Sequence, residues 1–393
     1  MLRSMGTRTM AAPIQLHSLL SRAMELGASD LHLKVGRPPG IRVHGHLAPA
    51  DAMAELVPED TARMAEQMMT AAQLARLDEH AEVDLAYEVD GLGRFRVNVF
   101  RQRGQVGMVL RVIAANVPGF DDLGLPPALT NISEERRGLV LVTGTTGSGK
   151  STTLAAIVDR INSTRPENIV TIEDPIEYLH RDKRSFVNQR EVGVDTGTFA
   201  TALRAALRQD PDVILVGEMR DRETISVALL AAETGHLVLS TLHTLDAAET
   251  IQRIIAAFPP EEQKQLRHQL ASTLKAVVSQ RLMRRADAHG RVPAVEVLVS
   301  TAYIRDCIAN PEKTALIRDA IAAGSSQYGM QTFDQALFAL YERGLVTYEE
   351  AIAGATNPGE FKLRVSGIRA SSDLTAEESL AGEETAGVER FRS

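Results

Sequence analysis

The amino-acid sequence predicts an α/β protein in which a small α+β domain precedes a doubly wound α/β domain with a helical C-terminal end. Three patterns indicate this arrangement. Apolar and polar residues alternate in short runs between residues 31 and 112, as in strands with one buried face. Four runs between residues 139 and 241 are apolar throughout and are separated by helical stretches, which favours a buried parallel sheet. From about residue 260 onward, helical periodicity predominates.

Length and composition fit several globular domains. A chain of 393 residues exceeds the size at which single cores stop growing, and 44% of the residues are hydrophobic. The net charge of −8 gives no basic excess, so we expect no direct nucleic-acid partner. The single cysteine, Cys307, excludes an internal disulfide and fits a reducing cytoplasm. Because no run of about 18 apolar residues occurs, we expect no transmembrane segment, and any membrane association must go through a partner.

The α+β domain is expected over residues 14–117, after a disordered stretch over residues 1–13. Helical spacing from Ile14 to Leu26 ends at Gly27, a plausible helix terminator. Alternation on both sides of an RPPG turn predicts a hairpin over residues 31–43. A Met- and Ala-rich helical stretch, 59–77, precedes three further alternating runs at 85–89, 95–99 and 106–112.

The remaining boundaries follow from changes in composition. Residues 118–133 begin with a Gly- and Pro-rich segment and are expected to be a linker. The core of the α/β domain is expected over residues 134–294, with strands at 139–143, 169–173, 213–217 and 237–241. Residues 295–370 are expected to be mainly helical, with one strand near 295–299. Residues 371–393 are expected to form a disordered acidic tail.

The sequence GTTGSGKS, from Gly144 to Ser151, matches the phosphate-binding loop pattern and lies between an apolar strand and a helical run. Its glycines let backbone N–H groups point at phosphate oxygens, and the following helix adds partial positive charge. Lys150 is expected to reach the β- and γ-phosphates of ATP, and Ser151 to bind Mg²⁺. The predicted nucleotide contacts are Gly144, Thr145, Thr146, Gly147, Ser148, Gly149, Lys150, Ser151 and Thr152.

Carboxylates follow two of the predicted strands. Proteins with such loops need a carboxylate at a neighbouring strand end to hold the metal or to position the attacking water. Glu218, in DVILVGEMRD, is the favoured catalytic carboxylate, and Glu173, in TIEDPIEY, is a second candidate. Acidic residues at strand ends are also common on ordinary loop surfaces.

Two histidines and a row of arginines complete the candidates. His236 and His243 flank the apolar run at 237–241. A lone histidine there would usually be structural, whereas a pair beside a nucleotide site could sense the phosphate state or relay between subunits. In GRFRVNVF, Arg94, Arg96 and Asn98 share the face opposite Phe95 and Val97. Arginines on a strand face are most often solvated, but they can also stabilise charge in phosphoryl transfer.

Four of these blocks, in this order, resemble the PilT-like secretion ATPase family. GTTGSGKST resembles its Walker A box, TIEDPIEY its Asp box, LRQDPDVILVGEMRD its Walker B box and ETGHLVLSTLHT its His box. The resemblance extends from about Leu19 to Ile368. It implies a PAS-like N-terminal domain, a RecA-like P-loop ATPase domain and a homohexameric ring with nucleotide sites between the two domains.

The resemblance also implies residue roles. Glu218 would be the catalytic carboxylate, and Glu173 and Glu177 would lie near the metal and the water. His236 and His243 would be coupled to the nucleotide. Two arginines fifteen positions apart reach the phosphates in related ATPases, and Arg96 and Arg111 have that spacing.

Within the family, the chain resembles the branch that drives type IV pilus retraction. Extension ATPases usually carry a four-cysteine zinc motif, which one cysteine cannot form, and GMQTFDQAL also resembles the retraction branch. One motif departs, because YIRDCIAN keeps Arg305 but has Ala309 in place of the branch's second arginine.

The prediction is therefore a hexameric ATPase motor for pilin disassembly and twitching motility. Its expected partners are an inner-membrane pilus platform protein (PilC-like) and a paralogous ATPase. Its expected location is cytoplasmic and peripheral at the inner membrane, at the pilus base. The alternatives are an accessory retraction ATPase, an extension or type II secretion ATPase, a RecA-like nucleic-acid translocase and a non-hydrolysing binding subunit.

Overall fold

The computed structural model describes residues 15–43, 45–50, 53–113 and 117–367. The disorder predicted for residues 1–13 and 371–393 lies outside these ranges. The chain folds into two compact units: the described residues before Val117, with Glu177–Leu179, form the first, and the other described residues form the second. Each unit has its own hydrophobic core. The predicted fold class, an α+β part followed by an α/β part with a helical end, is confirmed.

The first unit is a six-stranded antiparallel sheet packed against helices α1 (Leu16–Glu25), α2 (Pro58–Met68) and α3 (Ala71–His80). The strand order is β3-β2-β1-β6-β5-β4. The strands span β1 Asp30–Leu33, β2 Gly40–Val43, β3 His46–Pro49, β4 Glu82–Val89, β5 Gly93–Gln102 and β6 Gln105–Val112. Alternate residues of β5, including Phe95, Val97 and Val99, enter the core, as the period-2 pattern predicted.

The single helical stretch predicted over 59–77 is wrong, because two helices occupy it. Thr70 caps the second helix: its side-chain oxygen accepts the backbone N–H of Gln73, and the Gln73 side chain accepts the Thr70 backbone N–H. This reciprocal capping box starts a new helix where composition alone continues the old one.

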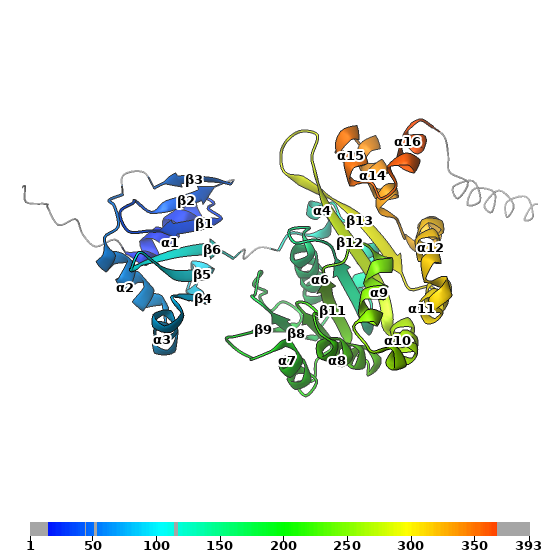
Figure 1. Cartoon of the computed structure of the whole chain (residues 1–393), viewed down its shortest axis with the longest axis horizontal. Helices are drawn as coiled ribbons and strands as arrows, with labels where there is room; N and C mark the ends of the chain where they lie inside the picture. Colours follow the sequence, from blue (N-terminus) through cyan, green and yellow to red (C-terminus); the bar gives the residue numbers. More distant parts are fainter. Residues whose placement is uncertain (1–14, 44, 51–52, 114–116, 368–393) are drawn as a thin grey trace, which may run out of the picture. The chain divides into compact units, whose positions relative to one another are not determined.

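The second unit is a seven-stranded sheet in the order β13-β12-β7-β11-β10-β8-β9 (Figure 1). All neighbouring strands are parallel except β12 and β13, which form an antiparallel hairpin. The strands span β7 Gly138–Thr143, β8 Asn168–Glu173, β9 Phe186–Glu191, β10 Val213–Val216, β11 Leu237–Leu242, β12 Leu274–Arg284 and β13 Arg291–Val299. The four strands predicted from apolar runs are present, whereas β9 and β12 were missed.

Helices cover both faces of this sheet. One face packs on α5 (Ala128–Ser133) and α6 (Lys150–Thr164), with Ile157 and Val158 among the buried residues. The other face packs on α7 (Phe199–Ala206), α8 (Arg222–Glu233), α9 (Ala247–Ala256) and α10 (Pro260–Thr273). Central strands are therefore buried on both sides, which explains why their sequences are apolar throughout.

The linker predicted over 118–133 is wrong. Helix α4 (Phe120–Leu123) and helix α5 lie in this segment, and Leu125, Leu129 and Ile132 are buried in the core beside α6. The Gly and Pro residues mark helix ends: Gly124 adopts φ 65° after α4, and Pro127 precedes α5.

The boundary predicted at 294/295 is also wrong, because it cuts through β13 and separates it from β12. The sequence of β12, LKAVVSQRLMR, mixes polar residues into an apolar run. Two of these polar side chains form hydrogen bonds to neighbouring elements: Ser279 bonds Thr143 of β7, and Gln280 bonds Thr153 of α6.

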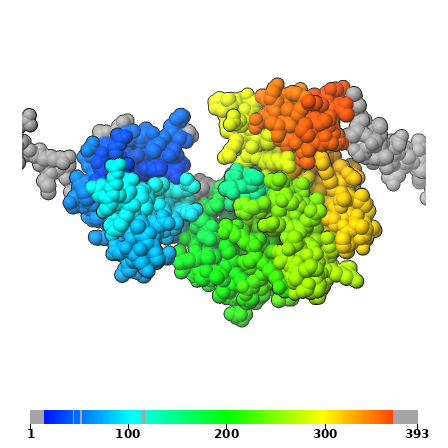
Figure 2. Space-filling view, viewed as in Figure 1, coloured from blue at the N-terminus to red at the C-terminus, as the bar shows by residue number. Residues whose placement is uncertain are grey.

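Beyond the sheet the described chain is helical from Ala302, within the part expected to be mainly helical over residues 295–370. Helices α11 (Ala302–Ala309) and α12 (Ile317–Ala323) join the core on the α9 face. The 3₁₀ helix Pro311–Leu316 and helix α13 (Ser325–Tyr328) complete this stretch. Helices α14 (Phe333–Glu342), α15 (Tyr348–Gly354) and α16 (Pro358–Val365) form a separate small core with Met283, Val292 and Ala294 of the hairpin. Figure 2 shows these helices, in orange, directly against the yellow surface of the hairpin.

Candidate nucleotide site

The phosphate loop joins the carboxyl end of β7 to the first residue of α6, Lys150. Thr145, Thr146 and Gly147 are exposed at its apex, whereas Gly144 and Ser148 are buried at its base. The backbone is held in this curve by hydrogen bonds from Ser148 N to Thr145 O, 3.2 Å, and from Thr153 N to Gly149 O, 3.0 Å. The exposed apex and the amino end of a 15-residue helix form a surface suited to an anion.

Gly144 is required where it stands. Its φ of 144° is rare for residues with a side chain, and a Cβ there would lie 2.5 Å from both Gln280 O and Ser148 Oγ. Strand β12 therefore presses directly against the base of the loop. Gln280 also donates from Nε2 to Thr153 Oγ1, 2.9 Å, which ties β12 to the first turn of α6.

Lys150 lies inside the loop. Its ammonium donates to Gly144 O and to Thr145 O, both at 2.9 Å, and the residue is only 8% exposed. A buried lysine held by loop carbonyls places a fixed positive charge beside the loop amides. Ser148 Oγ is buried without a hydrogen-bond partner among the described residues. Ser151 and Thr152 are half-buried in the next positions of α6.

Both predicted carboxylates stand at the same edge of the sheet as the loop. Glu173 is the last residue of β8, and its Oε1 accepts from Thr171 Oγ1, 2.7 Å, and from Gln189 Nε2, 3.1 Å. Glu218 follows β10 by two residues. Gly217 N donates to Ile172 O, 2.8 Å, and a Cβ on Gly217 would lie 3.2 Å from that oxygen, so the glycine allows the two strand ends to approach closely.

Glu218 links two other charged groups of the site. Its Oε1 lies 2.6 Å from Arg220 NH2, and its Oε2 lies 3.5 Å from His243 Nε2. The carboxylate is 12% exposed, whereas Arg220 and His243 are 73% and 49% exposed. One carboxylate is therefore oriented by a cation on one side and by an imidazole on the other, with both partners open to solvent.

His236 lies far from the phosphate loop of its own chain. The predicted contact between His236 and the nucleotide is therefore not made within one chain. His236 precedes β11, and its carbonyl accepts the N–H of Gly138 at the start of β7. The six residues of β11 put it roughly 20 Å from His243 along the strand. Its Nδ1 lies 2.9 Å from Ala231 O in the last turn of α8, the structural role that a lone histidine usually has.

Glu177, predicted to lie near the metal and water, is exposed in the connection between β8 and β9. Its neighbour Ile176 is buried, and the Ile176 backbone N–H donates to Glu191 Oε2, 3.3 Å. This bond anchors the connection directly beside Glu177. The role of Glu177 near the metal stays a prediction from the family resemblance.

The two arginines of the first unit are directly opposite one another. Arg96 on β5 and Arg111 on β6 are register partners, and both are exposed. Arg111 Nε donates to Asp30 Oδ1, 2.8 Å. Burial opposes ionisation of Asp30, but the hydrogen bonds from Arg111 and Ser29 outweigh burial and hold the pKa of this carboxyl below its usual value. Two guanidinium groups side by side on an exposed face favour an anionic ligand.

Sequence reasoning missed three contributors to the site. Arg220 could have been found, because it lies two residues after Glu218 in the GEMRD block. Ser279 and Gln280 gave no signal, because they lie 136 and 127 residues from Thr143 and Thr153, the partners of their side chains. Only strand pairing of β12 with β7 brings them to the loop.

The residues of the candidate site suit a Mg²⁺ ion that binds together with a nucleotide better than a metal ion held by protein side chains alone. Within the described ranges, no group of three or more His, Cys, Asp or Glu side chains could hold a metal ion. Mg²⁺ commonly takes one or two protein ligands and completes its shell with phosphates and water. The Ser151 hydroxyl and the Glu173 carboxylate at the sheet edge are donors of this kind.

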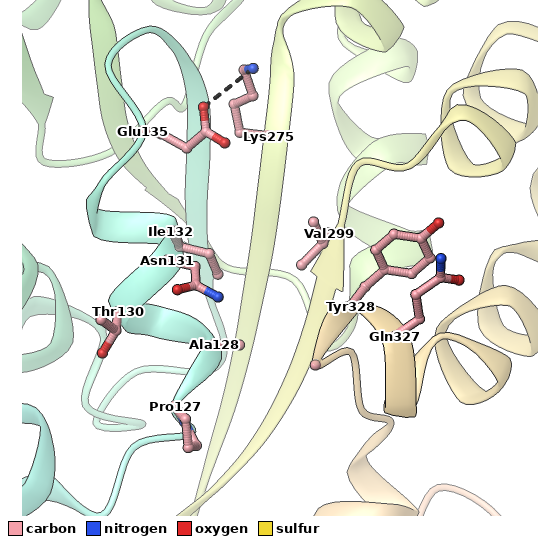
Figure 3. A pocket seen from close by; sticks show the side chains of 11 residues that line it. Pro127, Ala128, Thr130, Asn131, Ile132, Glu135, Lys275, Val299, Gln327 and Tyr328 are labelled. Atoms are coloured by element: carbon pink, nitrogen blue, oxygen red, sulfur yellow. Dashed lines mark ion pairs between the residues drawn. The ribbon is translucent and has the colours of Figure 1, made fainter.

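A separate pocket of about 640 Å³ lies at the other end of the sheet (Figure 3). Lys275, near the start of β12, pairs with Glu135 at 3.3 Å on one side, and Tyr328 and Gln327 of the α13 segment lie across from them in the view. None of the predicted site residues lines it. No helix in the described part of the chain is both long enough and apolar enough to cross a membrane.

Comparison with known proteins identifies the family. The family model described as Type II/IV secretion system protein matches residues 8–340. The chain is 46% identical to the "Type IV pilus retractation ATPase PilT" of Pseudomonas aeruginosa, over 88% of this chain and 100% of the relative. It is 42% identical to the type IV pilus ATPase PilU of the same organism, over 90% of this chain and 91% of the relative.

A solved structure agrees with this result. The crystal structure of the pilus retraction motor PilT with bound ADP matches with a TM-score of 0.82 and 47% identity, over 88% of this chain and 98% of that chain. The family match, the length of the matches and the nucleotide-type site lead to one conclusion: the chain belongs to the Type II/IV secretion system protein family, together with the pilus ATPases that it resembles.

Proposed function

We propose that this chain is a motor subunit that hydrolyses ATP to power type IV pilus retraction. The observation that carries the proposal is the meeting of Lys150, Glu173 and Glu218 at one edge of the sheet. Identity of 46% to a pilus retraction ATPase over that relative's whole length supports the biological role.

The loop and Lys150 bind the triphosphate. The loop amides and the amino end of α6 hold the phosphates, and the Lys150 ammonium exchanges its carbonyl partners for phosphate oxygens. Ser151 and, through water, Glu173 would hold Mg²⁺, and the ion would supply positive charge that offsets the negative charge of the phosphates. Glu218 orients the attacking water and takes its proton, while His243 and Arg220 fix the direction of its carboxylate.

Arg96 and Arg111 belong to the same proposal. Their guanidinium groups stabilise negative charge on the phosphates in the transition state, as the fifteen-residue spacing implies for this family. Replacing Arg96 with Ala is expected to lower kcat about 100-fold while the free energy of unfolding changes little, because the side chain is exposed. Arg111→Ala is expected to lower kcat as well and also to destabilise the first unit, because Asp30 loses a partner. If each variant keeps wild-type kcat, the arginine role is wrong.

The assembly and location follow from the same resemblance. We infer a homohexamer that acts on an inner-membrane pilus platform protein and sits peripherally on the cytoplasmic side of the membrane at the pilus base. Sequential hydrolysis around the ring removes pilin subunits from the pilus. Size-exclusion chromatography with light scattering, with and without a slowly hydrolysed ATP analogue, tests the assembly.

The biochemical test is ATP turnover by the purified chain. Magnesium-dependent ATPase is expected, and Glu218→Gln is expected to lower kcat about 100-fold or more while nucleotide binding is retained. Arg220→Ala removes one orienting partner but leaves the carboxylate itself, so it is expected to lower kcat less, by about tenfold. Turnover that is undiminished in Glu218→Gln contradicts the assignment of the catalytic carboxylate.

The cellular test separates retraction from extension. Deletion of the gene is expected to give hyperpiliated cells without twitching movement, whereas bald cells contradict the proposal. An accessory role is the second candidate, because Ala309 replaces an arginine of the retraction branch and identity to PilU is 42%. Retraction that persists when the paralogous ATPase alone is supplied would favour the accessory role.

A further inference from the structure

Glu296, on β13, is a buried carboxylate that takes no part in the site described above. We infer that Glu296 is a positioning residue, which fixes the loop carrying His243 against Glu218 by accepting the first backbone N–H of α9. The inference rests on the proposed ATPase function, and it assigns a role to a side chain 78 positions away from Glu218 in the sequence.

The contact is a buried one between two elements. Ala247 N donates to Glu296 Oε1 at 2.9 Å, and the two residues are 0% and 5% exposed. Ala247 is the first residue of α9, so its N–H has no partner within the helix. Leaving this N–H unpaired in a dry site is costly, so the position of the helix start depends on the acceptor.

The loop from His243 to Asp246 is tied tightly to α9. Leu245 N donates to Glu249 Oε2, 2.8 Å, and Glu249 N donates to Asp246 Oδ1, 2.7 Å. Thr244 Oγ1 and Thr250 Oγ1 are 2.6 Å apart. Because these bonds stay within the loop and α9, the loop and the start of the helix behave as one body.

Glu296 connects this body to the sheet beside the phosphate loop. Its register partner on β12 is Ser279, which accepts a hydrogen bond from Thr143 Oγ1 at 2.9 Å, one residue before Gly144. A path of contacts thus runs from the strand under the phosphate loop, through Glu296 and Ala247, to His243 and its contact with Glu218.

The surroundings make the carboxylate unusual. Burial raises the pKa of Glu296 to about 7, against the lowering effect of the Ala247 hydrogen bond. Asp246 of the α9 cap, Arg281 of β12 and Arg318 of α12 are the charged groups that influence it. Arg281 is itself engaged elsewhere, since its guanidinium lies 3.9 Å from the Phe333 ring centroid and NH1 donates to Gly354 O at 2.6 Å. The Ala247 amide is therefore the close polar contact that defines the role of Glu296.

The test compares two variants of nearly equal shape. Glu296→Gln keeps an oxygen acceptor, whereas Glu296→Met fills the same space without one and also removes a buried carboxylate, so it is expected to fold. In the full chain, Glu296→Met is expected to lower kcat about tenfold with KM for ATP within about twofold, and Glu296→Gln is expected to keep most of kcat. Glu167→Gln is the control, because Glu167 is a partly buried carboxylate at the opposite end of the sheet, where it pairs with Arg165 and not with a helix start.

A double-mutant cycle with His243→Ala decides whether Glu296 acts through His243. If it does, Glu296→Met has no further effect on kcat in the His243→Ala background. The inference is overturned if the two substitutions lower kcat by independent factors, if the Met and Gln variants have equal kcat, or if Glu296→Met leaves kcat unchanged. In each of these cases, turnover by the wild-type chain leaves the proposed function intact. Absence of turnover in the wild-type chain overturns both.

Discussion

At the carboxyl end of the parallel sheet, β7, β8 and β10 are followed by groups that can meet a phosphate. At the amino end, His236 before β11 and Lys275 of β12 contact Ala231 O and Glu135, and none of the predicted phosphate-binding residues lies there. In parallel strands all carboxyl ends lie at one edge, so residues from distant blocks of the sequence converge there. The edge on which a residue lies, and not its distance along the chain, therefore decides whether it joins the site.

The largest effect is expected when the positive charge of Lys150, at the carboxyl end of the parallel sheet, is removed. Lys150→Ala is expected to weaken ATP binding and to reduce turnover about 1,000-fold, because the buried ammonium beside the loop amides is lost. Equilibrium binding of a fluorescent ATP analogue and steady-state ATPase assays measure the two effects. Binding and turnover close to wild type would contradict the placement of the nucleotide site at this edge.

His243 and His236 lie at opposite edges of the parallel sheet, so replacing each of them tests the two edges separately. His243→Ala is expected to lower kcat about tenfold, because Glu218 loses an orienting partner. His236→Ala is expected to change kcat by less than about twofold and to lower the melting temperature instead, because its ring contacts the end of α8. Parallel ATPase and thermal-unfolding assays test this, and an equal loss of kcat in both variants breaks the comparison.

A smaller effect is expected on the way the stability of the fold depends on pH, through the Glu296 carboxyl. The native carboxyl stays protonated up to about pH 7, whereas the unfolded chain loses this proton near pH 4.5. The unfolded state therefore binds fewer protons in this window, and stability is lost as pH rises through it. Glu296→Gln cannot ionise, so its melting temperature relative to wild type is expected to increase by about 5–10 °C between pH 5 and pH 8. Scanning calorimetry at several pH values measures this, and a constant difference would contradict it.

The smallest expected effect lies at the amino end. Lys275→Ala removes an ion pair whose side chains are 33% and 39% exposed. Such partly exposed pairs contribute about 0.5 kcal/mol or less, so urea unfolding is expected to change little and kcat to stay at the wild-type value. A clear loss of kcat would show that the pocket beside Lys275 communicates with the other edge of the sheet.

The spacing of apolar residues correctly predicted the strands that are buried on both faces. Runs such as LVLVT and VILVG became β7 and β10, because a strand covered on both faces is apolar throughout. It failed for β12, where Ser279 and Gln280 interrupt the apolar run to bond Thr143 and Thr153. It also failed for residues 118–133, because glycine and proline that end helices are indistinguishable in sequence from those of a linker.

The phosphate loop, its lysine and the strand-end carboxylates could be predicted from local sequence, because they depend on residues adjacent in the chain and on the period of each strand. The distant groups that complete the candidate site could not be, because they are brought together by the packing of separate segments. Strand pairing put Gln280 against Gly144, and it placed His243 beside Glu218 while leaving His236 at the far end of the same strand. The physical reason is that local spacing fixes only the path of one segment, whereas hydrogen-bonded register and burial fix where separate segments meet.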